Sequence, residues 1–176
     1  MKKTLIIFSF ILIGTSCSVQ NLALDREKCI ITKNGFKQYK IGETKIDEVI
    51  QDYGTNFKKI DDQTWFYQIV YKELGLSFSY GSANIVRAME FYPPFEGETD
   101  KGIELNVSTM ADVKLAYDSL DWYISPPWQE WCSEYPGIEF CVNRDTSLPK
   151  WPLDENLHNL KEITRIIVID NYNEFE

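Results

Sequence analysis

Three glutamates around one turn signal are the first residues of this chain that could carry chemistry. Glu130 and Glu134 precede the turn-forming dipeptide Pro136-Gly137, and Glu139 follows it. Side chains alternate in a two-stranded hairpin, so all three would project from the face opposite the core. Glycoside hydrolases use pairs of carboxylates. A carboxylate-based hydrolase that uses these glutamates or Asp154 is therefore one hypothesis.

The same face also suits contact with another protein. Trp128 lies just before the glutamates and Trp151 follows them, and tryptophan is a typical anchor of protein interfaces. An acidic, aromatic surface would attract a basic partner, whereas a solvated outer sheet face without a partner is the structural alternative. Glu134 and Glu139 would lie directly opposite each other, which is unfavourable unless both are solvated. We expect a non-enzymatic protein without catalytic residues, whose partner-binding residues are Trp128, Glu130, Glu134, Glu139 and Trp151.

Two cysteines flank the same turn. If Pro136-Gly137 is the turn of the hairpin, Cys132 and Cys141 lie opposite each other, within reach of a disulfide. An exported protein meets an oxidising environment that favours this bond, although a type II turn at Pro-Gly could shift the register. Cys29 has no obvious partner, and we expect it to be a small buried residue rather than a nucleophile.

The remaining residue types give no cofactor or metal motif. His158 is the single histidine and lies in the segment 145–160, where no nucleophile is spaced to meet it, so we expect a solvated loop residue. Zinc would require three or four coherently spaced ligands, and Asp61-Asp62 lacks the alternating ligands of a calcium loop. No glycine-rich phosphate loop occurs. We therefore expect neither a metal nor a cofactor.

The N-terminus has the order of an export signal. Lys2 and Lys3 precede an apolar run from Leu5 to Ile13, which is shorter than the roughly 20 residues of a membrane span. The small residues that lead to Cys17 resemble the lipobox of bacterial lipoproteins, with Gly14 where that family usually has Leu. This resemblance implies a signal peptide at 1–16, a lipidated Cys17 and a tether at 17–28. Ordinary signal-peptide cleavage, which would leave a soluble secreted protein, is the alternative.

The lipoprotein resemblance also implies a location. In that family an Asp directly after the lipidated cysteine signals retention at the inner membrane, and this chain has Ser18 there. The resemblance therefore implies a lipid-anchored protein of the cell envelope, on the outer membrane and facing the periplasm. Only the N-terminal lipid would contact the membrane.

Charge and composition limit the class of partner. The chain has 176 residues and a net charge of −9, and removal of residues 1–16 with their two lysines would make it −11. An acidic surface argues against nucleic acid and anionic lipid as partners. The aromatic content of 14% is too high for a disordered chain. An immunity or inhibitor protein against a basic toxin or enzyme is a second candidate of the binding class.

Two similar stretches predict the elements that position these residues. Ile41 to Gly54 and Leu105 to Asp118 each contain Thr or Ser, an acidic residue followed by Val, and a later Tyr at matching spacings. Apolar residues three and four apart predict helices from Ile46 and from Met110, with Thr44 as the first N-cap. Ser108 or Thr109 is the expected second N-cap, and alternating strands follow each helix. Alternation assigns to the core Ile69, Tyr71, Leu76, Phe78, Tyr80, Trp131, Tyr135, Ile138, Phe140 and Val142.

We therefore predict an α+β protein with two tandem copies of a helix followed by a three-stranded antiparallel sheet. The first copy spans 29–98 and includes an N-terminal edge hairpin, which begins at Ile30 to Thr32 and turns at Asn34-Gly35. The second copy spans 99–176 and contains an insertion at 145–160.

This order of elements resembles two known architectures. From Ile41 to about Asp170 it is similar to the tandem β-lactamase inhibitor protein, and to the small lipoprotein of the outer-membrane β-barrel assembly machinery. The resemblance rests on the two similar helix starts and on the strand order. It implies an architecture of helices before short antiparallel sheets. No functional residue of either family can be placed here, and architecture alone does not imply function.

Overall fold

A computed structural model describes residues 29–61, 67–118, 121–125, 130–143 and 155–170. Trp128, Trp151, Asp154 and Cys17 lie outside these ranges. The fold is α+β. Its helices are α1 (Ile46–Tyr53), the 3₁₀ turn η1 (Lys72–Leu74), α2 (Met110–Tyr117) and α3 (Glu155–Asn159). Its strands are β1 (Ile30–Thr32), β2 (Gly35–Phe36), β3 (Tyr39–Lys40), β4 (Lys58–Asp61), β5 (Tyr67–Tyr71), β6 (Leu76–Tyr80), β7 (Val86–Phe91), β8 (Glu98–Thr99), β9 (Asp121–Ser125), β10 (Glu130–Tyr135), β11 (Ile138–Asn143) and β12 (Arg165–Ile169).

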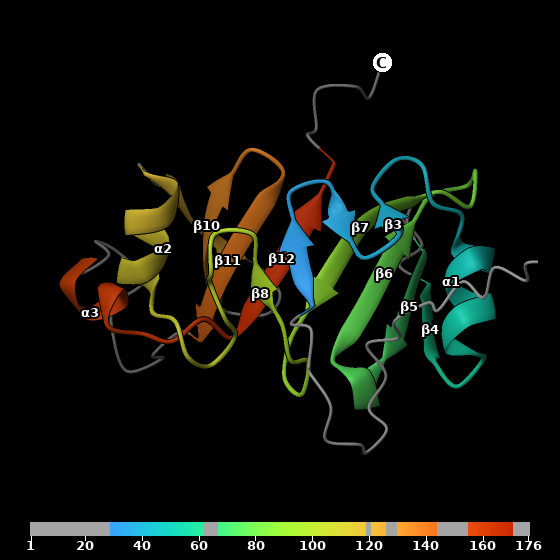
Figure 1. Ribbon diagram of the computed structural model, residues 1–176, viewed down its shortest axis with the longest axis horizontal. Helices are drawn as coiled ribbons and strands as arrows, with labels where there is room; N and C mark the ends of the chain where they lie inside the picture. The colour runs from blue at the N-terminus through green and yellow to red at the C-terminus, as the bar shows by residue number, and fades with distance from the viewer. Residues whose placement is uncertain (1–28, 62–66, 119–120, 126–129, 144–154, 171–176) are drawn as a thin grey trace, which may run out of the picture.

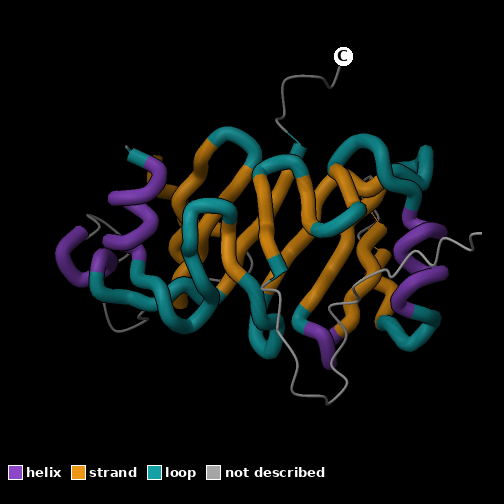
Figure 2. The backbone as a smooth tube through the Cα atoms, viewed as in Figure 1, coloured by secondary structure: helices purple, strands orange, loops and turns teal. Residues whose placement is uncertain are grey.

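Two sheets organise the molecule. The larger is antiparallel, in the order β4-β5-β6-β7-β12-β11-β10-β9, and the smaller has the order β3-β2-β1-β8. Figure 1 shows the small sheet in front of the middle of the large one, with α1 and α2 near opposite ends. Figure 2 shows the same arrangement, with strands in the centre and helices at both sides. Within the described ranges, none of the helices is long and apolar enough to cross a membrane.

The core lies on the face of the large sheet that α1, α2 and the small sheet cover. All ten strand residues that alternation assigned to the core are at most 7% exposed, so this prediction is confirmed. Phe91 on β7 connects the layers, because its ring lies 5.2 Å from the ring of Phe36 on β2 and 4.9 Å from that of Phe95. We call the covered side the inner face and the opposite side the outer face.

The two helices start where the periodicity predicted, but their caps differ. The N-cap of α1 is Lys45 rather than Thr44, and its side chain makes no capping hydrogen bond. Thr109 caps α2, where its Oγ1 accepts a hydrogen bond from the backbone N–H of Asp112. The Asp112 carboxylate accepts one in return from the N–H of Thr109, at 2.7 Å. Of these two helices, α2 alone therefore has a reciprocal capping box.

The segments before α1 and α2 make equivalent hydrogen bonds, and each residue in the second segment is numbered 64 higher than its counterpart in the first. The hydroxyl of Thr44 accepts a hydrogen bond from the N–H of Lys40 at 2.7 Å, and that of Ser108 from the N–H of Glu104 at 3.0 Å. Further on, Lys45 forms an isolated bridge with Ile85, just before β7, and Thr109 forms one with Glu162, shortly before β12. Each helix start is thus tied to the chain that leads into a central strand of the large sheet.

The number of strands after each helix was predicted wrongly. Within the described ranges, four strands of the large sheet follow α1 and four follow α2, because β4 and β9 precede the expected three in each case. β8 of the small sheet also lies between β7 and α2. β4 lacks the alternation of a half-buried strand, since Lys58, Lys59 and Asp61 are all exposed at the edge of the sheet. β9 is followed by Pro126-Pro127, so its sequence looked like part of a loop.

The N-terminal hairpin forms, but it is not an edge of the large sheet. β1, β2 and β3 pair with one another, and β1 also pairs in parallel with β8. Thr32 faces Gly35, so the turn is one residue earlier than predicted. Gly35 has φ +147°, and a Cβ there would lie 2.0 Å from the carbonyl oxygen of Tyr39. A larger residue at position 35 therefore cannot fit without moving the backbone.

The two caps give a matched pair of substitutions. We expect Thr109→Ala to lower the free energy of unfolding by about 1 kcal/mol, because it removes the side-chain acceptor of the capping box. We expect Lys45→Ala to change it by less than about 0.5 kcal/mol, since that side chain caps nothing. Urea unfolding followed by circular dichroism measures both. Equal effects of the two substitutions would contradict the assignment of the caps.

Candidate functional site

The first predicted carboxylate, Glu130, belongs to a charge network on the outer face. Arg165 on β12 lies between two glutamates, with Nη2 2.5 Å from Oε2 of Glu130 and Nη1 3.2 Å from Oε2 of Glu90. The amide of Gln68 on β5 donates to Oε1 of Glu90 and to Oγ of Ser77 on β6, both at 3.0 Å. The network extends from β5 to β10 and crosses the junction of the two halves of the sheet.

Most of this network is removed from solvent. The side chains of Arg165, Glu130 and Glu90 are 8%, 15% and 19% exposed. Burial raises the pKa of Glu130, because the attraction of Arg165 does not fully offset the loss of solvent and the nearby charge of Glu90. Two carboxylates share one guanidinium, so Arg165 is needed to keep both of them charged.

The other two predicted glutamates lie as the hairpin register requires. Glu134 on β10 pairs with Glu139 on β11, and on its other side with Asp121 on β9. Glu134 is exposed, whereas Glu139 is only 8% exposed. An outer face that exposes all three glutamates, as expected from sequence, is therefore wrong. Of the three, only Glu134 is openly available to a partner.

The cysteines around the turn face each other across β10 and β11. The Cα atoms of Cys132 and Cys141 are 4.1 Å apart, and a disulfide joins the two residues. Both are fully buried, and Cys29 is 9% exposed, as expected for a small buried residue. The sulfurs of Cys132 and Cys141 are therefore not nucleophiles in the oxidised protein.

One group in the described part of the chain has the composition of a metal site. One ligand atom from each of Glu130, Cys132 and Cys141 lies within 4.8 Å of the others. The two sulfurs are bonded to each other, and the Arg165 guanidinium lies against the carboxylate. Metal ligation by cysteine requires thiolates, and a neighbouring positive charge repels a cation. The oxidised cluster therefore does not suit a metal ion.

His158 is not the solvated loop residue expected from the sequence. It lies on α3, is fully buried, and its ring centroid is 3.5 Å from that of Trp131. The segment that the sequence indicated as an insertion therefore supplies part of the core. This position fits a packing role for the imidazole beside an inner-face residue of β10.

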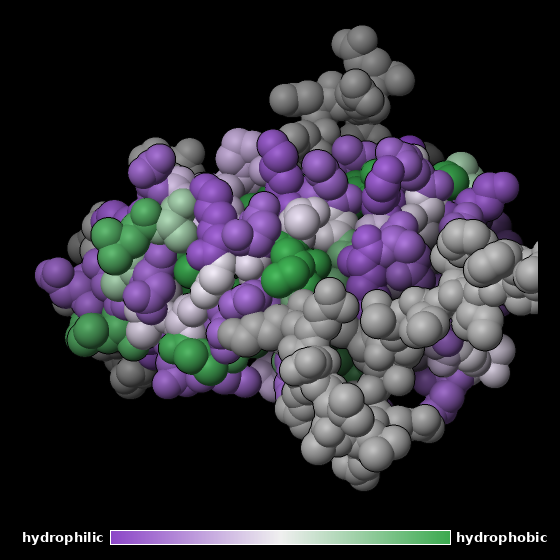
Figure 3. Space-filling model, in the orientation of Figure 1, coloured by the Kyte–Doolittle hydropathy of each residue, from purple (hydrophilic) through white to green (hydrophobic). Residues whose placement is uncertain are grey.

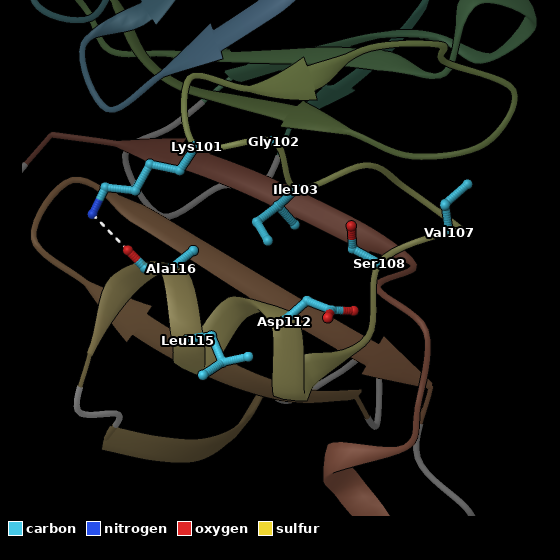
Figure 4. A pocket seen from close by; sticks show the side chains of 8 residues that line it. All are labelled: Lys101, Gly102, Ile103, Val107, Ser108, Asp112, Leu115 and Ala116. Carbon is cyan, nitrogen blue, oxygen red and sulfur yellow. Dashed lines mark hydrogen bonds between the residues drawn. The ribbon is translucent and has the colours of Figure 1, made fainter.

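The described surface also carries a groove that the sequence did not indicate. One wall is α2 and the other is the chain from 101 to 108, as Figure 4 shows. The groove has a volume of about 490 Å³, and we call it the α2 groove. It is lined by Lys101, Gly102, Ile103, Val107, Ser108, Asp112, Leu115 and Ala116.

Lys101 closes one end of the α2 groove. Its Nζ donates to the carbonyl oxygen of Ala116 at 2.9 Å and lies 4.1 Å from the ring centroid of Tyr117. The ammonium therefore satisfies a carbonyl at the C-terminal end of α2. This lysine positions the wall of the groove, and its charge is already partly compensated.

Apolar side chains gather around this groove. Val107 is 67% exposed and Leu115 is 84% exposed, and Leu157 and Leu160, on and just after the neighbouring α3, are 43% and 77% exposed. Figure 3 shows several areas of hydrophobic surface, separated by hydrophilic surface, at the α2 and α3 end of the molecule. Four of the five large hydrophobic residues that are exposed in the described ranges belong to α2, to α3 or to the chain beside them, so exposed apolar residues are concentrated at this end of the molecule.

Comparisons with known proteins find no matching family model, curated protein or solved structure. What the site does must therefore be argued from its own residues.

The region around α1 provides an internal reference for these exposed apolar residues. The residues 64 positions before Val107 and Leu115 are Glu43 and Gln51, which are exposed and polar. The contacts that precede the two helices are the same, so this backbone does not require apolar side chains at those places. The exposed Val107 and Leu115 therefore need an explanation other than folding.

The helical periodicity could not assign a role to Leu115. The predicted stripe of α2 contains Met110 and Val113, which are buried, and Tyr117, which is half-buried. Leu115 is off that stripe, so the only signal in the sequence was an apolar residue on the polar side of a helix. The groove itself depends on the path of the chain from 101 to 108, which no local pattern predicts.

The outer-face network predicts a strong dependence on Arg165. We expect Arg165→Met to lower the free energy of unfolding at pH 7 by about 3 to 5 kcal/mol, because it leaves two buried carboxylates unpaired. We expect a smaller loss at pH 5, since burial raises the pKa of Glu130 and its protonation removes the repulsion between the two carboxylates. Chemical unfolding at both pH values measures the difference. A loss under about 1 kcal/mol at both would contradict the role of the network.

Two further variants serve as controls. Arg87 pairs with Asp170 at 2.7 Å, but both side chains are about 40% exposed, so Arg87→Met should lower the free energy of unfolding by less than about 1 kcal/mol.

The second variant tests Glu130, whose pKa is higher in the folded protein than in the unfolded chain. The folded wild type therefore binds more protons between these two pKa values, and its free energy of unfolding falls as the pH rises through that range. Glu130→Gln should remove that decrease and leave the pairing of Arg165 with Glu90 intact.

Proposed function

We propose that this chain is a non-enzymatic, lipid-anchored protein of the cell envelope that binds another protein. The observation that carries the binding function is the set of exposed apolar residues at α2 and α3, of which Val107 and Leu115 have the polar Glu43 and Gln51 at the places 64 positions earlier. Exposed apolar residues concentrated in this way are typical of a protein interface. The acidic composition, with a net charge of −9, favours a basic partner.

The hydrolase hypothesis gains no support from the arrangement of the carboxylates. Glu130 is ion-paired with Arg165, and Glu139 is almost fully buried. None of the three glutamates lines the α2 groove. A general acid needs a carboxyl that can reach a substrate, and of these residues only Glu134 is exposed.

The proposed binding residues fall on two separate surfaces. Glu134 projects from the outer face of the large sheet, because its neighbours Ser133 and Tyr135 point to the core. α2 packs on the inner face through Met110 and Val113. The acidic, aromatic face with Trp128 and Trp151 is therefore one proposed contact surface, and the α2 groove is a second one with better structural support.

Support for the proposed location comes from the sequence of the N-terminal segment. Lipidation of Cys17 would anchor the protein to a membrane, and the absence of Asp at position 18 favours the outer membrane, on the periplasmic side. An immunity or inhibitor role against a basic toxin or enzyme is consistent with the same charge. Both roles are non-enzymatic binding to a basic protein.

We also propose that the two halves derive from one duplicated unit. Support comes from the order of elements, because a helix followed by four strands of the large sheet occurs twice, with β8 added in the first half and α3 in the second. Further support comes from side chains: Lys37 lies 5.8 Å from the ring centroid of Tyr53, and Lys101 lies 4.1 Å from that of Tyr117, again 64 residues on. Glu43 and Gln51 would then be the polar counterparts of Val107 and Leu115.

The lipid anchor is tested by removing the acceptor sulfur. We expect Cys17→Ser to move the protein from the membrane fraction to the soluble fraction, because a cysteine thiol is required for lipidation. Fractionation with a high-salt wash measures this, and the intact mass of the mature wild-type protein should include acyl chains on residue 17. A variant that stays on the membrane, or a wild-type Cys17 that is a thiol or in a disulfide, would contradict the proposal.

The binding function is tested with the native protein. Affinity purification of the tagged, acylated wild type from detergent-solubilised envelopes should retain one protein in near-stoichiometric amount. The double variant Trp128→Ala/Trp151→Ala tests the acidic, aromatic face: loss of the partner with an unchanged melting temperature would support that face. Wild-type protein that retains nothing under mild salt would contradict the binding function as a whole.

A further inference from the structure

We infer that the α2 groove receives a large apolar side chain from a basic segment of a partner protein, an inference that rests on the proposed binding function. The groove offers an apolar contact at Val107 and Leu115 and polar groups at Ser108 and Asp112. An interface anchor of this type buries one apolar residue at the centre and places charged residues around it. Ile103 supplies the buried floor, with 3% exposure.

The residues around the groove favour a basic segment. From 98 to 118 the chain carries five acidic residues and two lysines, a net charge of −3. Lys101 is occupied by the Ala116 carbonyl and the Tyr117 ring. Lys101 and Asp112 are the charged residues of the lining and offset each other, so the negative charge of this region comes from the flanking Glu98, Asp100, Glu104 and Asp118. Hydrogen bonds from Thr109 lower the pKa of Asp112, so its carboxylate stays charged at neutral pH.

The same charges argue against a second copy of this chain as the occupant. A symmetric contact would place two grooves, each in a segment of net charge −3, against each other. Two chains of net charge −9 also repel each other at a distance. An anionic lipid surface is disfavoured for the same reason. A basic partner segment satisfies both the apolar groove and its acidic surroundings.

Site-specific crosslinking in the native envelope tests this occupant. The photoreactive residue p-benzoylphenylalanine would replace Leu115 in the acylated protein, and in a control it would replace Gln51 at the matching place on α1. We expect a protein adduct at position 115 and not at 51, and mass spectrometry should place the crosslink in a segment with net positive charge and a large apolar residue. No adduct at 115, equal adducts at both positions, an adduct with lipid or with a second copy, or an acidic segment would each overturn the inference.

A second measurement uses the crosslinked segment as a synthetic peptide. Leu115→Gln gives α2 the residue that α1 carries, and it should weaken binding by about tenfold or more, because it removes one buried apolar contact. Gln51→Ala should leave the affinity unchanged, and replacement of the basic residues of the peptide by Glu should abolish binding. Unchanged affinity in Leu115→Gln would overturn the inference. A partner that is retained by affinity purification without crosslinking at 115 would refute the groove and leave the binding function standing, whereas no retained partner would refute both.

Discussion

The antiparallel pairing of β7 with β12 joins the two halves of the large sheet. Ile166 faces Phe91 and Val168 faces Met89, and all four side chains are at most 1% exposed. These residues supply the middle of the inner face, on which the small sheet packs through Phe36. A four-stranded half with one short helix would bury little apolar surface by itself, so the pairing makes one core out of two marginal ones.

The outer face shows a second consequence of that pairing. Glu90 comes from the first half and Glu130 and Arg165 from the second, so the ion-pair network exists only when the halves are in register. A shift of β12 by one residue would move Arg165 to the inner face. We therefore expect the buried charges to disfavour incorrect registers, a role attested for some buried polar groups.

Local patterns predicted the parts of this fold that depend on local geometry. Alternation identified the inner-face residues of β5, β6, β10 and β11, and the 3.6-residue period located α1 and α2, because burial on one side imposes those periods. The edge strands β4 and β9 escaped prediction, since an edge strand need not alternate. The position of His158 was also missed. Its burial depends on contact with Trp131 across about 27 residues of sequence, and a five-residue helix has too few positions to show a period.

The contacts of the candidate site also fall into those that local sequence patterns predicted and those that they did not. The register of the hairpin could be counted from the turn, and it brought Glu134 opposite Glu139 and Cys132 opposite Cys141. The pairing of Glu130 with Arg165 could not be predicted by counting from a turn, because a long connection separates β11 from β12 in the sequence.

The parallel pairing of β1 with β8 also joins segments that lie far apart in the sequence. β1 leaves the ribosome early, yet its parallel partner is Glu98–Thr99, so the small sheet can close only after the chain of β4 to β7 is available to fold.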